Sequence, residues 1–144
     1  MKVGKWELTD LYPGAHIRVS CNGYYHHGIY IGDGEVVQFG LPTDVYVDPK
    51  EIKVMRSPLA DFCGKALFIE VYKYSKKELK EKKSDEEIIK TALSCVGEGG
   101  YNILQNNCEH FTNRCIFGFN KSEQIDEIYR QVSNMLKLWL NYIV

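Results

Sequence analysis

Two short segments of the chain contain the residues that could do covalent chemistry. The first carries the adjacent histidines His26 and His27, and the second carries Cys108 directly after an Asn106-Asn107 pair. Because asparagine is a preferred N-cap, Cys108 is predicted to open a helix, where backbone N–H groups and the helix dipole favour an anion. A thiol in that position is expected to have a lowered pKa and to act as a nucleophile. The alternative is a buried structural cysteine, and position alone supports both about equally.

A nucleophilic thiolate needs a base or a cationic partner. His110 lies two residues after Cys108 and therefore points about 200° round the helix, away from the thiol; we interpret it as structural. His26 and His27 are consecutive on a predicted strand, so their side chains face opposite sides. Only one of them can face the thiol, and the residues alone do not choose between them.

Gln38 is the candidate for a third polar group that would orient the imidazole. It lies twelve residues after His26, and a hairpin turning at 32–34 would place the two on neighbouring strands. Its side-chain oxygen could then contact the ring, whereas the alternative is an ordinary exposed strand glutamine. A metal site from Cys108, His110 and His26 is disfavoured because a fourth ligand is lacking. We therefore expect neither a metal nor another cofactor.

The elements that must position these residues change in type along the chain. Strands come first, and alternation and turn signals such as Asn22-Gly23 predict them at 16–21, 26–31, 35–39 and 66–72. Helices follow and are predicted from Ser84, from Cys108 to Phe117 and from Ser122 onward. The segment 41–58 is expected to be irregular and to cross the surface. This order indicates an α+β fold, in which a small antiparallel sheet packs on helices.

Length and composition indicate one globular domain, 1–144. The 144 residues are 44% hydrophobic and 26% charged, and the net charge of −1 gives no reason to expect a nucleic-acid partner. Five cysteines without a C-x-x-C pair favour free thiols in a reducing compartment, and hence a cytoplasmic location. The first ten residues lack the apolar region of a signal peptide, and no run of 18 apolar residues predicts a spanning helix.

The two segments, taken together, resemble the lecithin:retinol acyltransferase-like family. They read His26-His-Gly-Ile-Tyr-Ile-Gly-Asp33 and Asn107-Cys-Glu-His-Phe111, in the order and at the distance of that family's two blocks. With Pro13-Gly14 the resemblance covers about residues 11–117. The family is a circularly permuted relative of the NlpC-type papain-like peptidases. The resemblance therefore implies a small antiparallel sheet packed on helices, with the nucleophile at a helix N-terminus.

The resemblance also implies a role for each candidate residue. Cys108 would be the nucleophile and His26, the first histidine of the pair, the general base. The family usually has a second histidine as its third residue, and this chain has Gln38 at that position; related thiol enzymes also use an amide there. Tyr24 matches a family tyrosine that would help the oxyanion site and position the substrate.

The chemistry implied by the resemblance is acyl transfer through a thioester. It predicts a thiol acyltransferase or hydrolase that acts on lipid acyl esters, so the expected partner is an acyl-donor small molecule or lipid. Two alternatives remain, namely a cysteine amidohydrolase or peptidase of the NlpC type and a non-catalytic binding module that retains the fold. The amphipathic segment 122–144 is expected either to pack on the domain or a partner helix, or to make peripheral contact with a membrane.

Overall fold

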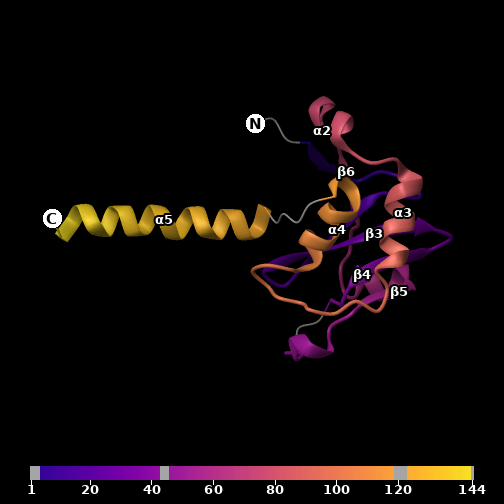
Figure 1. The fold of residues 1–144 in the computed structure, drawn as a ribbon, viewed down its shortest axis with the longest axis horizontal. Coiled ribbons are helices and arrows are strands. Elements are labelled where there is room, and N and C mark those ends of the chain that lie inside the picture. The colour runs from indigo at the N-terminus through magenta and orange to yellow at the C-terminus, as the bar shows by residue number, and fades with distance from the viewer. Residues whose placement is uncertain (1–3, 43–45, 119–122, 144) are drawn as a thin grey trace.

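The computed structural model describes residues 4–42, 46–118 and 123–143, which form an α+β structure (Figure 1). Within these residues, six strands make one antiparallel sheet in the order β1-β6-β2-β3-β4-β5. The strands are β1 (Lys5–Glu7), β2 (His16–Cys21), β3 (Tyr24–Gly32), β4 (Glu35–Phe39), β5 (Val54–Pro58) and β6 (Glu70–Lys73). The helices are the 3₁₀ helix η1 (Pro49–Glu51), α1 (Leu59–Cys63), α2 (Lys76–Glu81), α3 (Asp85–Ser94), α4 (Cys108–Phe117) and α5 (Glu123–Ile143).

The strands β2, β3 and β4 form the predicted meander at the centre of the sheet. β2 and β4 have the predicted bounds, and β3 is longer than predicted by two residues at its start and one at its end. The β2–β3 turn uses Gly23, whose φ of 87° lies in the left-handed region that favours glycine. Because this turn joins β2 to β3 directly, it sets the register in which Cys21 pairs with Tyr24.

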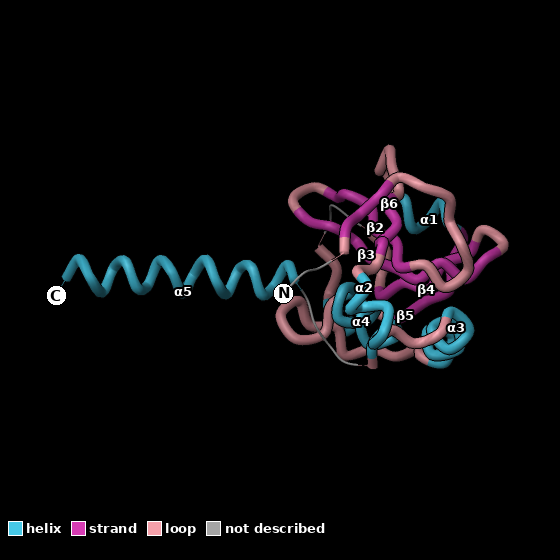
Figure 2. The backbone as a smooth tube through the Cα atoms, turned by 90° about the horizontal axis from the view of Figure 1, so that it is seen from above, coloured by secondary structure: helices cyan, strands magenta, loops and turns pink. Residues whose placement is uncertain are grey.

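The two faces of the sheet are covered by different helices, as Figure 2 shows from above. α3 and α4 pack on the face that carries Ile29 and Val37, where they build the larger hydrophobic cluster. The short helix α1 covers the opposite face, where fully buried Phe62 packs with Ile17 and Val19. Because neighbouring residues of a strand alternate between faces, every strand residue of the meander is assigned to one layer or the other.

The segment 41–58 was expected to be irregular, and that prediction is wrong at its end. Val54–Pro58 forms β5, which pairs with β4 along its whole length, from Phe39 opposite Val54 to Glu35 opposite Pro58. Only Val54 and Ser57 of this strand are buried, so the strand lacks the apolar alternation that sequence analysis relies on. The predicted strand 66–72 is likewise shifted to 70–73, because Leu67 and Phe68 are exposed and lie outside the sheet.

Local capping chemistry places the helices close to their predicted positions. Ser84 accepts a hydrogen bond from the backbone N–H of Glu87 at 3.2 Å and so begins α3. Asn107 caps α4, which ends at Phe117 before Gly118, whose φ is 86°. Ser122, at which the last helix was expected to begin, lies outside the described residues.

The last helix, α5, extends away from the rest of the molecule (Figures 1 and 2). Ile125 in its first turn is buried, whereas every side chain described from Ile128 to Tyr142 is exposed. Packing of this helix on the domain, one of the two expected arrangements, is therefore limited to its first turn. Among the described residues, no helix combines the length and the apolar character needed to cross a membrane.

Candidate active site

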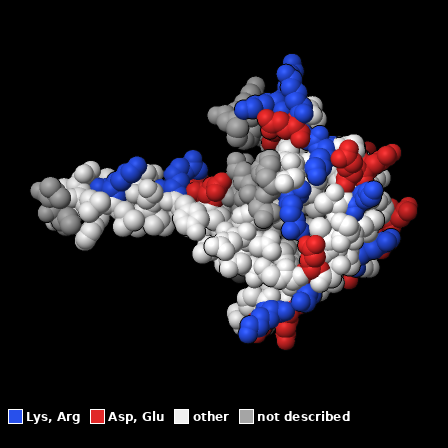
Figure 3. All heavy atoms as spheres, in the orientation of Figure 1, with Lys and Arg blue, Asp and Glu red and all other residues white. Residues whose placement is uncertain are grey.

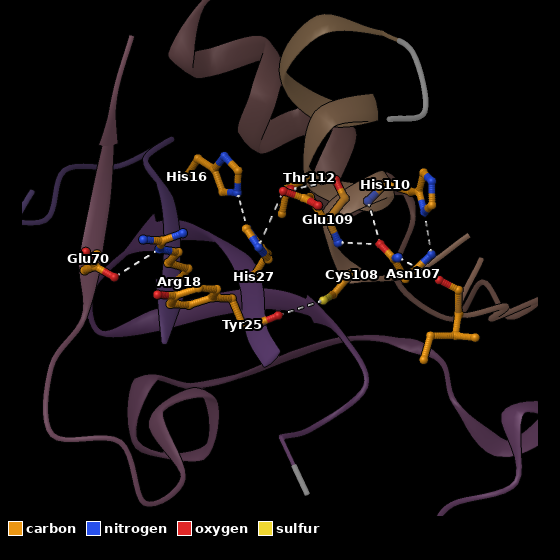
Figure 4. A network of polar contacts seen from close by, with 11 residues as sticks. His16, Arg18, Tyr25, His27, Glu70, Asn107, Cys108, Glu109, His110 and Thr112 are labelled. Carbon is orange, nitrogen blue, oxygen red and sulfur yellow. Dashed lines mark hydrogen bonds and ion pairs between the residues drawn. The ribbon is translucent and has the colours of Figure 1, made fainter. Parts of the chain in front are cut away.

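The start of α4 is held by an asparagine–histidine capping box. The Asn107 side-chain oxygen accepts hydrogen bonds from the backbone N–H groups of Glu109 at 2.9 Å and His110 at 3.0 Å, and the Asn107 N–H donates to His110 Nδ1 at 3.0 Å (Figure 4). These bonds fix the first turn, and with it Cys108 as the first helical residue. His110 is therefore a capping residue, which agrees with its interpretation as structural.

The sulfur of Cys108 lies against the backbone of β3. Cys108 Sγ is 3.9 Å from the carbonyl oxygen of Tyr25, and the backbone N–H of His27 also faces the sulfur. The pairing of β3 with β4 ends at Gly28 opposite Gln38, so Tyr25 and His27 belong to the part of β3 that continues beyond that pairing. Helix α4 thus places the thiol beside the Tyr25 carbonyl and the His27 N–H, in the part of β3 that does not pair with β4.

The electrostatic surroundings of Cys108 differ from the sequence-based prediction. Burial raises the pKa of the Cys108 thiol to about 12, and the nearby Glu109 carboxylate adds to this effect. The backbone N–H groups of His27, Glu109 and Cys108 lower the pKa but do not outweigh the loss of solvent. The expected lowering of the pKa is therefore wrong, because that prediction considered the helix terminus without the burial; the thiol is neutral at pH 7.

His26 and Gln38 are in direct contact on the face of the sheet covered by α1. His26 Nε2 lies 2.7 Å from Gln38 Oε1, and the Gln38 amide Nε2 donates a hydrogen bond to Ser57 Oγ. All three side chains are buried, Gln38 completely. The interpretation of Gln38 as an exposed strand glutamine is thus excluded, and the proximity predicted from the hairpin is confirmed.

Apolar packing holds the His26 ring and keeps it neutral. The Phe62 ring of α1 lies 5.1 Å from the imidazole, centroid to centroid. A Cβ atom on Gly28 would come within 2.7 Å of Phe62 Cε1, so glycine is required for this close approach. Burial lowers the pKa of His26 to about 4, although the hydrogen bond with Gln38 raises it in part. A neutral imidazole at pH 7 can accept a proton.

His27 takes part in a separate buried network on the opposite face of the sheet (Figure 4). Its Nδ1 lies 2.8 Å from His16 Nε2, and its Nε2 lies 3.7 Å from Glu109 Oε2. The Trp6 ring packs edge-on against both imidazoles. Because both ring nitrogens of His27 face these partners, the network joins β2, β3 and α4, and it leaves His26 as the better candidate for a base.

Cys108 and the His26–Gln38 pair meet the same stretch of β3 in different ways. Cys108 contacts the backbone on either side of His26, while the His26 ring lies on the α1 face with Gln38. Within the described residues, no hydrogen bond joins Cys108 to His26. Catalytic hydrogen bonds are often long before substrate binds. In the same described part of the chain, no group of three or more histidine, cysteine or acidic side chains could hold a metal ion.

Comparison with known proteins identifies the family of the chain. The family model described as "Lecithin retinol acyltransferase" matches residues 9–121, which include every candidate residue. The chain belongs to this family. The mouse protein named lecithin retinol acyltransferase is 27% identical over 92% of this chain, which spans 65% of the mouse protein's length. The human phospholipase A and acyltransferase 1 is 34% identical, covering 78% of this chain and 71% of that protein. The human phospholipase A and acyltransferase 3 is 32% identical over 81% of this chain and 76% of that protein.

Two tyrosines, Tyr24 and Tyr101, are neighbours in this lecithin retinol acyltransferase family member, and Tyr101 also neighbours Cys108. Tyr24 is at the start of β3 and is 40% exposed. Tyr101, which sequence analysis did not single out, packs edge-on against Phe39 at 5.1 Å. Burial raises the pKa of Tyr101, and the neighbouring Cys108 and Tyr24 raise it further. Tyr101 therefore lies close enough to both residues to interact with them electrostatically.

Ser57 is the other site residue that sequence analysis missed. It lies nineteen residues after Gln38, in a strand that was not predicted, and no motif marks it. Its contact with Gln38 follows from the β4–β5 pairing, in which Ser57 is opposite Val36 and Met55 is opposite Gln38. Only knowledge of this register could have identified it.

Proposed function

We propose that this chain is a thiol acyltransferase or hydrolase that takes an acyl group from a lipid ester onto Cys108. The observation that carries the proposal is the position of Cys108 at the start of α4, with its sulfur against the β3 backbone on either side of His26, whose ring pairs with Gln38. The relatives support the substrate class, because their names describe a lecithin retinol acyltransferase and phospholipases A with acyltransferase activity. The family match supports an enzyme rather than a binding module.

The first half of the proposed reaction begins from a neutral thiol and a neutral imidazole. His26 Nε2 faces Gln38, so Nδ1 accepts the thiol proton while Cys108 Sγ attacks the ester carbonyl carbon. A C–S bond forms, and the carbonyl oxygen becomes an oxyanion. When the ester C–O bond breaks, His26 returns the proton to the leaving alcohol, and a thioester on Cys108 remains.

The second half regenerates the thiol. Water, an alcohol or an amine attacks the thioester carbonyl, and His26 Nδ1 takes the proton of the attacking group. The C–S bond then breaks, and the proton passes to the departing sulfur. The proposed products are a fatty acid when water attacks, and a transferred ester or amide when an alcohol or amine attacks.

Backbone N–H groups of Cys108 and His27 are the proposed donors to the oxyanion. Both face the sulfur, which is where the reacting carbonyl must lie. The N–H groups of Glu109 and His110 donate to the Asn107 side chain. Tyr24 retains its proposed role in positioning the substrate, because it lies at the exposed start of β3.

The test supplies the full chain with phosphatidylcholine vesicles that carry a labelled acyl chain. Mass spectrometry then follows the fatty acid, the lysophospholipid and any acyl adduct on the protein. We expect an adduct on Cys108 and loss of turnover in Cys108→Ala. The matched control is Cys63→Ala, which alters a partly buried thiol on α1 and should retain turnover.

Two outcomes would contradict the proposal, and each points to one alternative. Turnover of peptide amides but not of lipid esters, still through Cys108, would indicate an amidohydrolase or peptidase of the NlpC type. Neither turnover nor an adduct with any ester or amide would indicate a non-catalytic binding module.

A lipid surface is the partner that we propose for α5. Apolar residues recur along one side of the helix at intervals of three or four residues, namely Ile125, Ile128, Tyr129, Val132, Met135, Leu136, Trp139 and Tyr142. Figure 3 shows the charged side chains of α5 confined to a few positions, with uncharged surface elsewhere on the visible side. Ile128, Met135 and Tyr142 widen the apolar stripe beyond the narrow seam of a coiled coil, and Trp139 and Tyr142 suit a boundary between water and acyl chains.

Sedimentation with phosphatidylcholine vesicles tests this proposal independently of activity. Leu136→Glu, in the apolar stripe, should reduce the bound fraction, whereas Asn134→Glu on the polar side should not. Both positions are exposed, so neither change disturbs the core. Equal binding by the two variants would contradict the proposal, as would self-association without vesicles that Leu136→Glu abolishes.

A further inference from the structure

The amide of Gln38 has two chemically different ends, and its burial makes their orientation consequential. Oε1 accepts a hydrogen bond and Nε2 donates, so the end that faces His26 decides which ring nitrogen of His26 carries the proton. In the structure, Oε1 faces His26 Nε2 at 2.7 Å, while the amide Nε2 faces Ser57 Oγ. Gln38 is fully buried, so water cannot replace either contact.

This orientation suits both protonation states that a general base must adopt. Facing an acceptor, the neutral His26 holds its proton on Nε2 and leaves the lone pair of Nδ1 for an incoming proton. The imidazolium formed after proton transfer still donates from Nε2 to the same oxygen. The reverse orientation would present N–H groups to Nε2, which would place the proton of neutral His26 on Nδ1 and remove its basic atom.

We infer that Ser57 is a positioning residue that selects the productive orientation of the Gln38 amide and thereby the tautomer of His26. This inference rests on the proposed function of His26 as a base. Ser57 is 4% exposed and lies on β5, whose register with β4 brings its hydroxyl to the amide nitrogen. The Ser57 hydroxyl oxygen accepts a hydrogen bond from the Gln38 amide N–H, which would otherwise be buried without a partner.

Removing the Ser57 hydroxyl should favour the reverse orientation of the amide. A buried N–H without a partner is rarer and more costly than an under-satisfied carbonyl oxygen. In Ser57→Ala the amide can rotate so that Nε2 donates to His26 and Oε1 takes the place beside the alanine. A carboxylate at position 38 has no N–H end, so the effect of Ser57 should depend on residue 38 being glutamine.

The first measurement is the ¹⁵N NMR spectrum of the histidine side chains at pH 7, which needs no substrate. The unmodified chain should show His26 protonated on Nε2, and Ser57→Ala should move the proton to Nδ1. Ser57→Thr keeps a hydroxyl and should keep the Nε2 tautomer. In the Gln38→Glu background, Ser57→Ala should leave Nε2 protonated, in the neutral ring and in the imidazolium alike. An unchanged tautomer in folded Ser57→Ala, or an equal change in Ser57→Thr, would overturn the inference.

The second measurement is kcat and KM on the labelled phosphatidylcholine. Ser57→Ala should lower kcat by about tenfold or more with little change in KM, because a wrong tautomer affects the base and not substrate binding. Ser94→Ala, which removes an exposed hydroxyl at the end of α3, is the matched control and should have no effect. A tautomer shift without any turnover in the unmodified chain would sustain the role of Ser57 and contradict the proposed function instead.

Discussion

His26 and His27 are consecutive residues of β3, and their rings lie on opposite faces of the sheet with different partners. His26 contacts Gln38 on the α1 face, whereas His27 lies between His16 and Glu109 on the α4 face. The alternation of the strand therefore gives the two histidines different partners and different roles. One ring belongs to the proposed acid–base machinery, and the other joins the strand to the helix that carries Cys108.

The pH dependence of turnover should reveal the lowered pKa of His26. Burial lowers the pKa of His26 to about 4, so the ring stays neutral at pH 5 and becomes protonated only as the pH falls through about 4. The kcat/KM for a lipid ester should accordingly remain high at pH 5 and decline near pH 4. In Gln38→Glu a carboxylate would favour the imidazolium, so the decline should begin at higher pH. A decline centred near 6.5 in the unmodified chain would contradict this expectation.

Alkylation of Cys108 should be slow in the folded protein. Its pKa is raised to about 12, so almost no thiolate is present at pH 7. Iodoacetamide should react with Cys108 more slowly in the native protein than in protein unfolded in guanidinium, as measured by mass spectrometry of the Cys108 peptide. The native rate should still rise above pH 8.5, where the unfolded thiol has passed its ordinary pKa of about 8.5. A native rate that levels off below pH 8 would show a preformed thiolate.

Removal of the α4 cap should destabilise the fold measurably. Asn107→Ala deletes the acceptor of the Glu109 and His110 N–H groups, and we expect a loss of about 1 kcal/mol, within a usual range of about 0.5–2 kcal/mol. Urea denaturation at pH 7 would measure the change in the free energy of unfolding. Asn107→Asp keeps the acceptor but loses the amide donor to the Ile103 carbonyl oxygen, so its loss should be smaller than that of Asn107→Ala. Equal losses in the two variants would show that the cap bonds do not stabilise α4.

The buried histidines should make the fold sensitive to acid. Burial lowers the pKa of His16 to about 3, and burial together with the neighbouring His16 and His26 lowers that of His27 well below its ordinary value. Between about pH 6.5 and 3 the unfolded chain therefore binds protons that the folded chain does not, so stability falls as the pH falls, by up to about 1.4 kcal/mol per pH unit for each such histidine.

Urea denaturation between pH 7 and 4.5 would measure this loss, and His16→Asn is the informative variant. Asparagine does not titrate, so the slope of unfolding free energy against pH should become shallower even if the variant is less stable at pH 7. A slope identical to that of the unmodified chain would contradict the assignment of His16 as a neutral buried group.

Short-range chemistry determined from the sequence which segments become the central elements and where the thiol lies. The turn at Asn22-Gly23, the alternation in 16–21 and 35–39, and the cap before Cys108 all act within a few residues. Their outcomes are therefore readable from local spacing. The same spacing brought His26 and Gln38 to neighbouring strands, because only a tight turn separates their strands.

Only the tertiary structure decided which surroundings these residues meet. Ser57 reaches Gln38 from a strand that lacks apolar alternation, and Cys108 meets the carbonyl of Tyr25 across 83 residues of chain. The pKa directions of Cys108 and His26 likewise depend on burial between layers that come together only on folding. A helix N-terminus favours a thiolate locally, but the removal of water by segments distant in sequence has the larger effect, and no local pattern in the chain carries that information.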